Sequence, residues 1–275
     1  MVSLIMMLDL VNSRGLSIMK RIILGSIALI ALGMSAPAVA ADMPVKAKAP
    51  PPVVLYDWSG VYVGFHAGYD WQRFDWAFNP PIVGGVNQTF SLNTDNWTYG
   101  VHGGAQVQWG QIVLGVEAAL SGMGGNYARH LGYGTDFGSF ADAKITELFT
   151  AGGRLGWTPL NNWLLYVNGG YANGLVKTRL ASVATGLEVA GFGTQVRQDG
   201  WYVGGGFDYL IHKGALVDAI VGLEYQHVDL GTDFHCIPSA CAASNANNHD
   251  LTAKVDIVRA RLTIKTQGYG WWGPM

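Results

Sequence analysis

Charged side chains are scarce in this chain of 275 residues. Only 13% of the residues are Asp, Glu, Lys or Arg, about half of the share that a soluble domain usually carries. The formal net charge is -2, so the chain lacks the excess of positive charge that indicates a nucleic-acid partner. Beyond the amino-terminal region, no apolar run is long enough for a membrane-spanning helix. These absences exclude an ordinary soluble domain and a helical membrane protein.

The signatures of catalysis are missing as well. The chain has no G-x-S-x-G motif, and its Ser, His and Asp residues form no set that the strands described below would bring together. We therefore predict that the protein is not an enzyme and has no catalytic residue, no metal site and no cofactor.

Apolar residues, glycine and aromatic rings are abundant instead: 49% of the chain is hydrophobic, with 38 Gly, 10 Trp and 12 Tyr. The clearest pattern is a hairpin over residues 97–121, in which apolar and polar residues alternate on both sides of Gly110. Alternate side chains of a strand point to opposite faces. The apolar face of the first strand holds Trp97, Tyr99, Val101, Gly103, Ala105, Val107 and Trp109.

The same alternation recurs along the chain and predicts eight strands. They cover residues 58–69, 97–109, 112–121, 145–157, 164–174, 201–209, 216–228 and 252–265. Each has about the length that a tilted strand needs to cross a bilayer. The connections alternate between short turns near residues 110, 160 and 213 and long segments at 70–96, 122–144, 175–199 and 229–251. This asymmetry is typical of an eight-stranded antiparallel up-and-down transmembrane β-barrel with long outer loops.

A soluble barrel around an apolar ligand would show the same alternation, but with its apolar faces turned inward. The charged residues decide between a membrane barrel and a soluble barrel, because they lie on the same strand face as the glycines. They are Glu117, Arg154, Asp208, Asp218, Glu224, Arg259 and Arg261. An apolar cavity does not accommodate so many charges, so we expect the polar face to line the lumen and the apolar face to contact lipid.

The amino-terminal region predicts export. A basic start at Met19-Lys20-Arg21, an apolar core and Ala38-Val39-Ala40 indicate a signal peptide over residues 1–40, cleaved after Ala40. An uncleaved anchor is the alternative. Residues 1–18 are expected to reflect an upstream start codon. We predict a proline-rich periplasmic linker over 41–56, the barrel over 57–266 and a carboxyl-terminal tail over 267–275.

Several segments together resemble a known family, the small outer-membrane immunogenic proteins of alphaproteobacteria, also called porin-family outer-membrane β-barrel proteins. The similar segments, in order, are WSGVYVGFHAGYDW, VLGVEAAL, GGRLGWTPLNNWLLYVNGGYA, GWYVGGGFDYLI, VGLEYQHVDLG and VRARLTIK. The resemblance covers nearly the whole mature chain. It implies a location in the cell outer membrane, contact with outer-membrane lipids and lipopolysaccharide, and insertion by the barrel-assembly machinery. We further expect a monomer.

The carboxyl terminus departs from the family pattern. Family members usually end on an aromatic residue directly after the lysine, whereas Thr266 follows Lys265 here and the tail TQGYGWWGPM continues. Because the terminal aromatic residue belongs to the insertion signal, this departure raises the question of whether insertion is efficient. Trp271 or Trp272 is the candidate substitute.

An eight-stranded barrel has a lumen just wide enough to be filled by its own side chains. Charges in such a space require partners. We predict an internal charge network of Glu117, Arg154, Asp208, Glu224, Arg259 and Arg261, which fills the lumen; a gate for small ions is the alternative. His66 and His102 face the same lumen and are expected to be hydrogen-bonded filling.

Cysteine occurs only at positions 236 and 241. Because an exported chain meets an oxidising compartment, we predict that Cys236 and Cys241 form a small disulfide in the last outer loop. A metal site with His235 and His249 is the alternative, although the spacing matches no specific zinc pattern. The outer loops also hold residue types that can ligate haem iron, and haem binding is reported within the resembling family. They are Tyr127, His130, Tyr133, His235 and His249.

The function predicted from the sequence is structural: envelope integrity and surface display by a barrel whose lumen is filled. A narrow porin-like channel for small solutes or ions is one alternative. Ligand binding or adhesion by the outer loops, with haem as the candidate ligand, is the other.

Overall fold

The computed structural model describes residues 56–78, 89–133, 136–189, 193–236 and 248–266. They form β-strands joined by turns. The strands are β1 (Gly60–Phe78), β2 (Thr89–Trp109), β3 (Ile112–Met123), β4 (Ala128–Tyr133), β5 (Asp136–Leu160), β6 (Trp163–Ser182), β7 (Thr194–Lys213), β8 (Val217–His235) and β9 (His249–Thr266). Within the described ranges, no helix is long and apolar enough to cross a membrane.

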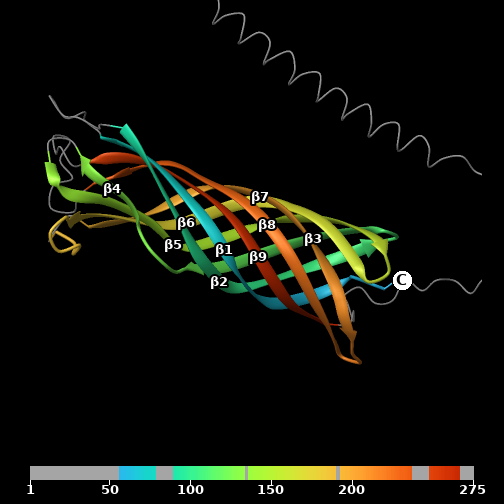
Figure 1. Cartoon of the computed structure of the whole chain (residues 1–275). Helices are drawn as coiled ribbons and strands as arrows, with labels where there is room; N and C mark the ends of the chain where they lie inside the picture. Colours follow the sequence, from blue (N-terminus) through green and yellow to red (C-terminus); the bar gives the residue numbers. More distant parts are fainter. Residues whose placement is uncertain (1–55, 79–88, 134–135, 190–192, 237–247, 267–275) are drawn as a thin grey trace, which may run out of the picture. The chain divides into compact units, whose positions relative to one another are not determined.

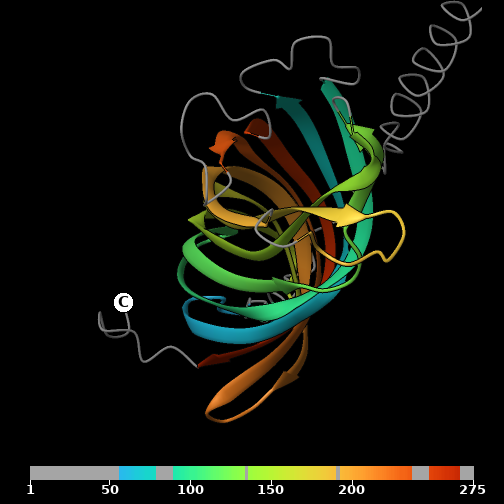
Figure 2. The same cartoon turned by 90° about the vertical axis from the view of Figure 1, so that its left-hand side faces the viewer.

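Eight of these strands close into a ring, which Figures 1 and 2 show from two directions. The order around the ring is β1-β2-β3-β5-β6-β7-β8-β9, and β9 pairs with β1. All pairings are antiparallel. The short β4 pairs with the beginning of β5. The predicted eight-stranded antiparallel up-and-down barrel is therefore confirmed.

One end of the ring carries short turns. Trp109 pairs with Ile112, which leaves Gly110 and Gln111 as a two-residue turn. Gly110 has φ of 61°, a left-handed conformation that the tight turns of hairpins require and that glycine adopts without strain. We call the half of the barrel next to these turns the proximal half.

Side chains of the proximal half follow the predicted alternation. On β1, Val61, Val63 and Phe65 point outward and are 60 to 67% exposed, whereas Tyr62 and His66 point inward and are each 4% exposed. The wall is thus apolar outside and polar inside. This is the reverse of a soluble protein and fits a surface that faces hydrocarbon.

The predicted long connections are wrong over most of their length, because the strands continue through them. We call these continuations the distal half. It comprises residues 72–78 of β1, 89–95 of β2, all of β4, 136–147 of β5, 173–182 of β6, 194–199 of β7, 229–235 of β8 and 249–256 of β9. In Figure 1 the distal half lies at the left.

The polarity of the wall reverses in the distal half. On β1, Phe74, Trp76 and Phe78 are now the inward side chains and are at most 5% exposed, while Arg73 and Asp75 point outward. The same inversion on the other strands builds an apolar core inside the barrel. Its members include Leu92, Ala143, Ile145, Leu148, Val176, Leu180, Leu230, Leu251, Val255 and Ile257. The distal half therefore has the apolar interior and polar surface of a protein that is surrounded by water.

The ring also divides in the distal half. The pairing of β2 with β3 ends at Thr98 and Met123, and the pairing of β7 with β8 ends at Trp201 and Asp229. Beyond these points the described residues form two four-stranded sheets around the apolar core. Sheet I has the order β2-β1-β9-β8, and sheet II has the order β4-β5-β6-β7.

Two bulges lie where the sheets begin to separate. The register of β5 shifts between Ile145 and Glu147, and that of β8 shifts between Asp229 and Thr232. Gly231, inside the second shift, has φ of 69°. A bulge bends its strand and increases the local twist, so these two positions allow a closed barrel to continue as a sandwich of two sheets.

Hydrogen bonds and ring stacking join the two sheets. The backbone N of Ile145 in sheet II donates to Oε1 of Gln72 in sheet I at 2.8 Å. At the boundary between β7 and β8, Nε2 of His235 lies 3.0 Å from Nε2 of Gln198. At the boundary between β2 and β4, the rings of Phe90 and His130 stack with centroids 4.2 Å apart.

Candidate functional site: the filled lumen

Glycines on the inward face of the proximal half make room for large polar side chains. A Cβ atom at Gly104 would lie 2.6 Å from the hydroxyl oxygen of Tyr62, and one at Gly64 would lie 2.6 Å from Nε2 of His102. A Cβ atom at Gly206 would lie 2.9 Å from the hydroxyl of Tyr166. The large polar side chains of the lumen therefore fill space that is free only because these positions are glycine.

Arg261 lies at the centre of this packing. Its Nη2 is 2.6 Å from Oε2 of Glu117 and its Nη1 is 2.8 Å from Oε1, so the guanidinium holds that carboxylate with two hydrogen bonds. The same Nη1 donates to Glu224. Arg259 holds Glu224 from the other side, with Nη2 2.6 Å from Oε1. Two carboxylates and two guanidinium groups thus form one continuous, fully buried set.

Arg154 extends the set toward the short turns. It donates to Asp208, and its Nη1 lies 3.7 Å from Oε2 of Glu117. Its guanidinium stacks 3.6 Å from the ring centroid of Tyr166. The structure therefore brings together all six residues of the predicted network, with three arginines facing three carboxylates. Such balance is what a charged cluster needs in a space without bulk water.

Two tyrosines complete the network, and the sequence pattern had not indicated their role. The hydroxyl of Tyr62 donates to Glu117 at 2.8 Å, and that of Tyr166 donates to Glu224 at 2.8 Å. Both residues lie on the inward face, and each pairs across the sheet with a glycine, Tyr62 with Gly104 and Tyr166 with Gly156 and Gly206. This placement distinguishes them from the tyrosines of the outer wall. Each hydroxyl satisfies a carboxylate oxygen that is buried away from water.

The lumen is closed at the proximal end by a second apolar cluster of Tyr56, Trp58, Val113, Leu164, Tyr166, Leu210 and Ile220. Next to this cluster, Nζ of Lys265 lies 3.6 Å from Asp218 and donates hydrogen bonds to the backbone oxygens of Asp57 and Ser59. Asp218 also accepts a hydrogen bond from Tyr56. The residues just before β1 therefore fold across the opening.

His66 and His102 lie side by side in the lumen. Their rings stack 5.6 Å apart; His66 Nε2 is 2.9 Å from Ser121 Oγ, and His102 Nε2 is 2.9 Å from Thr263 Oγ1. A serine next to a histidine suggests a hydrolase pair, but Nδ1 of His66 faces the other imidazole at 3.4 Å. In a catalytic triad a carboxylate occupies that position and orients the base.

The candidate haem ligands that the structure describes do not lie in exposed loops, although the rings of His235 and His249 stack with centroids 5.3 Å apart. His235 and His249 are buried at the rim of sheet I, where His249 stacks on Trp76 with ring centroids 3.6 Å apart. His130, on β4 of sheet II, stacks on Phe90 at the β2 edge of sheet I. Tyr127 lies beneath the guanidinium of Arg179 on sheet II. The side chain of Tyr133 lies outside the described part. These rings are engaged in packing, which the expectation of free loop residues did not anticipate.

Cys236 directly follows the last residue of β8. Cys236 is disulfide-bonded, and Cys241 lies outside the described residues, so the pairing of these two residues stays a prediction. Among the described residues, no group of three or more His, Cys, Asp or Glu side chains is arranged to hold a metal ion.

The stability of the distal half is expected to depend on pH through His235. Burial lowers the pKa of its imidazole to about 4, below the ordinary value of about 6.5. Between these two values the unfolded chain binds a proton that the folded chain does not, so stability is lost as pH falls from 6.5 toward 4. The loss amounts to about 3 kcal/mol. Digestion by an acid-active protease should begin in this window, and His235→Gln should remove that pH dependence. A wild-type protein with the same resistance at pH 7 and pH 4 would contradict this expectation.

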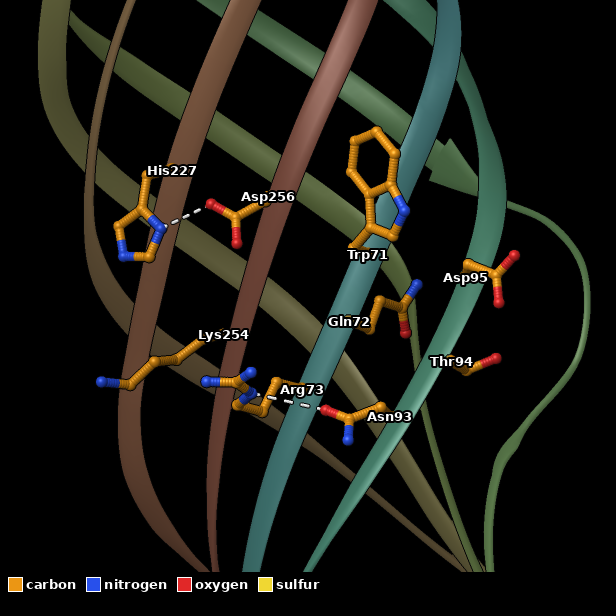
Figure 3. A pocket seen from close by; sticks show the side chains of 9 residues that line it. All are labelled: Trp71, Gln72, Arg73, Asn93, Thr94, Asp95, His227, Lys254 and Asp256. Atoms are coloured by element: carbon orange, nitrogen blue, oxygen red, sulfur yellow. Dashed lines mark hydrogen bonds and ion pairs between the residues drawn. The ribbon is translucent and has the colours of Figure 1, made fainter. Parts of the chain in front are cut away.

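A hollow of about 380 Å³ lies on the outside of sheet I and is drawn in Figure 3. Arg73 and Lys254 approach it from β1 and β9, and Asp95 and Asp256 contribute carboxylates. Asp256 also contacts Nδ1 of His227 at 2.7 Å. The hollow is open to the surroundings and its charges are mixed.

Comparisons with known proteins agree with this architecture. Residues 26–257 match the family described as outer membrane protein beta-barrel domain. The 31 kDa outer-membrane immunogenic protein of Brucella melitensis is 30% identical over 238 residues, which cover 78% of this chain and 88% of the relative, and that of Brucella suis matches equally. The crystal structure of Ail from Yersinia pestis covers 74% of this chain and 99% of its own, with 10% identity and a TM-score of 0.36.

The family match spans most of the chain and includes nearly all of the barrel. The apolar outer wall of the proximal half is then the surface that crosses the membrane, and the distal half projects from it. This chain therefore belongs to the outer membrane protein β-barrel domain family and is a protein of the cell outer membrane.

Proposed function

We propose that this protein is a sealed, non-enzymatic barrel that contributes to envelope integrity and displays its distal half at the cell surface. The observation that carries the proposal is the filling of the interior along its whole length. The apolar cluster around Trp58, the charge network around Arg261 and the apolar core around Phe74 follow one another from the proximal to the distal end. A solute on this axis would have to displace all three.

The distal core bears most directly on the channel alternative. A charge network alone is compatible with a gate, because ion pairs exchange partners and can admit water. The side chains of Phe74 and Ile257 have no polar group that could hydrate an ion, and that of Trp76 has only its indole N–H. Each of the three side chains is at most 2% exposed. Dewetted apolar constrictions block ions.

The closed ring also supports a monomer that the barrel-assembly machinery inserts. In the proximal half every strand pairs on both sides, so no open edge of this half faces lipid. An open edge in hydrocarbon would leave backbone groups without hydrogen bonds, at a cost of several kcal/mol for each group.

Planar-bilayer recordings test the proposal. The purified protein is expected to give no stepwise conductance, because the distal core stays closed at neutral pH. A porin prepared in the same detergent serves as the positive control. Reproducible unitary currents from the wild-type protein, changed in size by Arg261→Met, would show that ions pass through the lumen and would support the channel alternative.

A further inference from the structure

The two sheets of the distal half carry opposite charge on their outer walls. Among the described strand side chains, the outer wall of sheet I has two basic and five acidic residues. They are Arg73 and Lys254, against Asp75, Asp95, Asp229, Asp250 and Asp256. The outer wall of sheet II has five basic and three acidic residues. They are Arg129, Lys144, Lys177, Arg179 and Arg197, against Asp142, Glu147 and Asp199.

The first row of sheet II joins two arginines through one carboxylate. Register places Asp142 between Arg129 on β4 and Arg179 on β6. Nε of Arg129 donates to Asp142 at 2.7 Å, and Nε of Arg179 donates to it at 3.1 Å. The ring of Tyr127 lies 4.0 Å from the guanidinium of Arg179. One carboxylate neutralises one of the two cations, so the row keeps a positive charge that is held in place.

The second row places two lysines directly opposite each other. Lys144 on β5 pairs in register with Lys177 on β6, and neither forms an ion pair with any described residue. Nζ of Lys144 donates to the backbone oxygen of Gly125 at 2.7 Å. Burial, followed by the nearby charge of Lys177, lowers the pKa of Lys144, and the carboxylate of Asp70 opposes this shift. Like charges in direct cross-strand pairs are destabilising, and a bound anion would relieve the repulsion.

The height of these rows above the membrane indicates which anion they meet. Tyr171 is an outward-facing residue of β6 just before the distal half begins. Lys177 follows it by six residues, which is about 20 Å along the strand. Because barrel strands tilt by about 40°, the lysines lie about 15 Å beyond Tyr171 along the barrel axis. This height lies outside the hydrocarbon core of the bilayer. With the distal half on the outer side of the membrane, as proposed above, the lysines meet the sugar head groups of the outer leaflet.

We infer that the basic outer wall of sheet II, centred on Lys144 and Lys177, binds the phosphate groups of lipopolysaccharide head groups in the outer leaflet. Arg129 and Arg179 supply further positive charge beside the lysines. The acidic wall of sheet I faces away from this contact, so the barrel has one side that binds phosphorylated lipid. This inference rests on the proposed display of the distal half at the cell surface and names the partner of that half. The lipopolysaccharide assay is separate from the conductance measurement, so the two proposals can fail independently.

The test measures the affinity of detergent-solubilised, full-length protein for purified lipopolysaccharide at low salt. The double variant Lys144→Gln/Lys177→Gln is expected to bind about 25-fold more weakly, since each lysine near an anionic surface contributes about a fivefold factor. Wild-type protein is expected to lose a similar factor when the lipopolysaccharide has been dephosphorylated. Heat-modified mobility on gels checks that each variant forms the barrel.

The matched control is Arg73→Gln/Lys254→Gln, which removes two positive charges from sheet I (Figure 3). Little change in affinity is expected from it. An equal loss in both double variants would mean that the overall charge of the protein and not the wall of sheet II sets the affinity, and would overturn the inference. Displacement of lipopolysaccharide by inorganic phosphate at the same phosphate concentration would also overturn it, because the site would then be one for the free anion.

Discussion

Arg261→Met is expected to lower the free energy of unfolding by about 3 to 5 kcal/mol, because it removes one partner from a buried set of charges. Arg261 is the only described residue whose guanidinium contacts both Glu117 and Glu224. Without it, two carboxylates remain in the lumen with Arg154 and Arg259 as their nearest cations. Urea unfolding followed by tryptophan fluorescence measures the loss, and the temperature at which the heat-modified band appears on gels provides a second measure.

The control for this variant is Arg197→Met, the same substitution in an exposed ion pair. Arg197 contacts Glu147 at 2.8 Å, and both side chains are more than half exposed. Solvent screens such a pair, so its loss costs less than about 1 kcal/mol. Adding Glu117→Gln to Arg261→Met is expected to recover part of the stability, because it removes an unpaired charge. Equal losses from Arg261→Met and Arg197→Met would show that the network does not stabilise the barrel.

The proximal half could be predicted from the sequence because lipid imposes a simple rule on it. Hydrocarbon contacts Val61, Val63 and Phe65, whereas Tyr62 and His66 face the lumen. In this half, the apolar residues of the alternating pattern therefore always mark the outer face. The six network residues could be assigned to the lumen on the same ground. Their individual pairings could not, because Arg261 and Glu117 are 144 residues apart and meet only through the stagger of the closed ring.

The distal half was missed although its pattern is equally regular. In the segment from Phe74 to Phe78, apolar residues again alternate with polar ones, but they occupy the opposite phase. The eight predicted strands contain the apolar positions of one phase only, so the residues between them fall into predicted loops. The inversion arises because the solvent outside the wall changes from hydrocarbon to water, and the burial of apolar groups changes sides with it. A change of phase within a continuous strand pattern is therefore a signal for the point where a strand leaves the membrane.

This inversion predicts that the same substitution, Phe to Ala, has a large effect on stability at one position of β1 and a small effect at another. Phe74→Ala is expected to lower the stability of the distal half by about 3 to 5 kcal/mol, since a fully buried ring is replaced by a cavity in a packed core. Phe65→Ala removes the same atoms from a side chain that is 67% exposed on the lipid-facing wall. Lipid tails fill the space there and are as apolar as the ring, so little stability is lost.

The measurement on these two variants must report on the distal and proximal halves separately, because the membrane-spanning proximal half is expected to stay folded in Phe74→Ala. Proteinase K added to proteoliposomes should cut the distal half of the Phe74→Ala protein at a concentration that leaves the wild type intact. The fragments should still run as a heat-modifiable barrel, because the network around Arg261 and the ring of strand pairs in the proximal half do not depend on the distal core. Phe65→Ala should be as resistant as the wild type. Equal protease sensitivity of the two variants would mean that Phe74 does not lie in a packed interior, and the apolar core between the two sheets of the distal half would have to be abandoned.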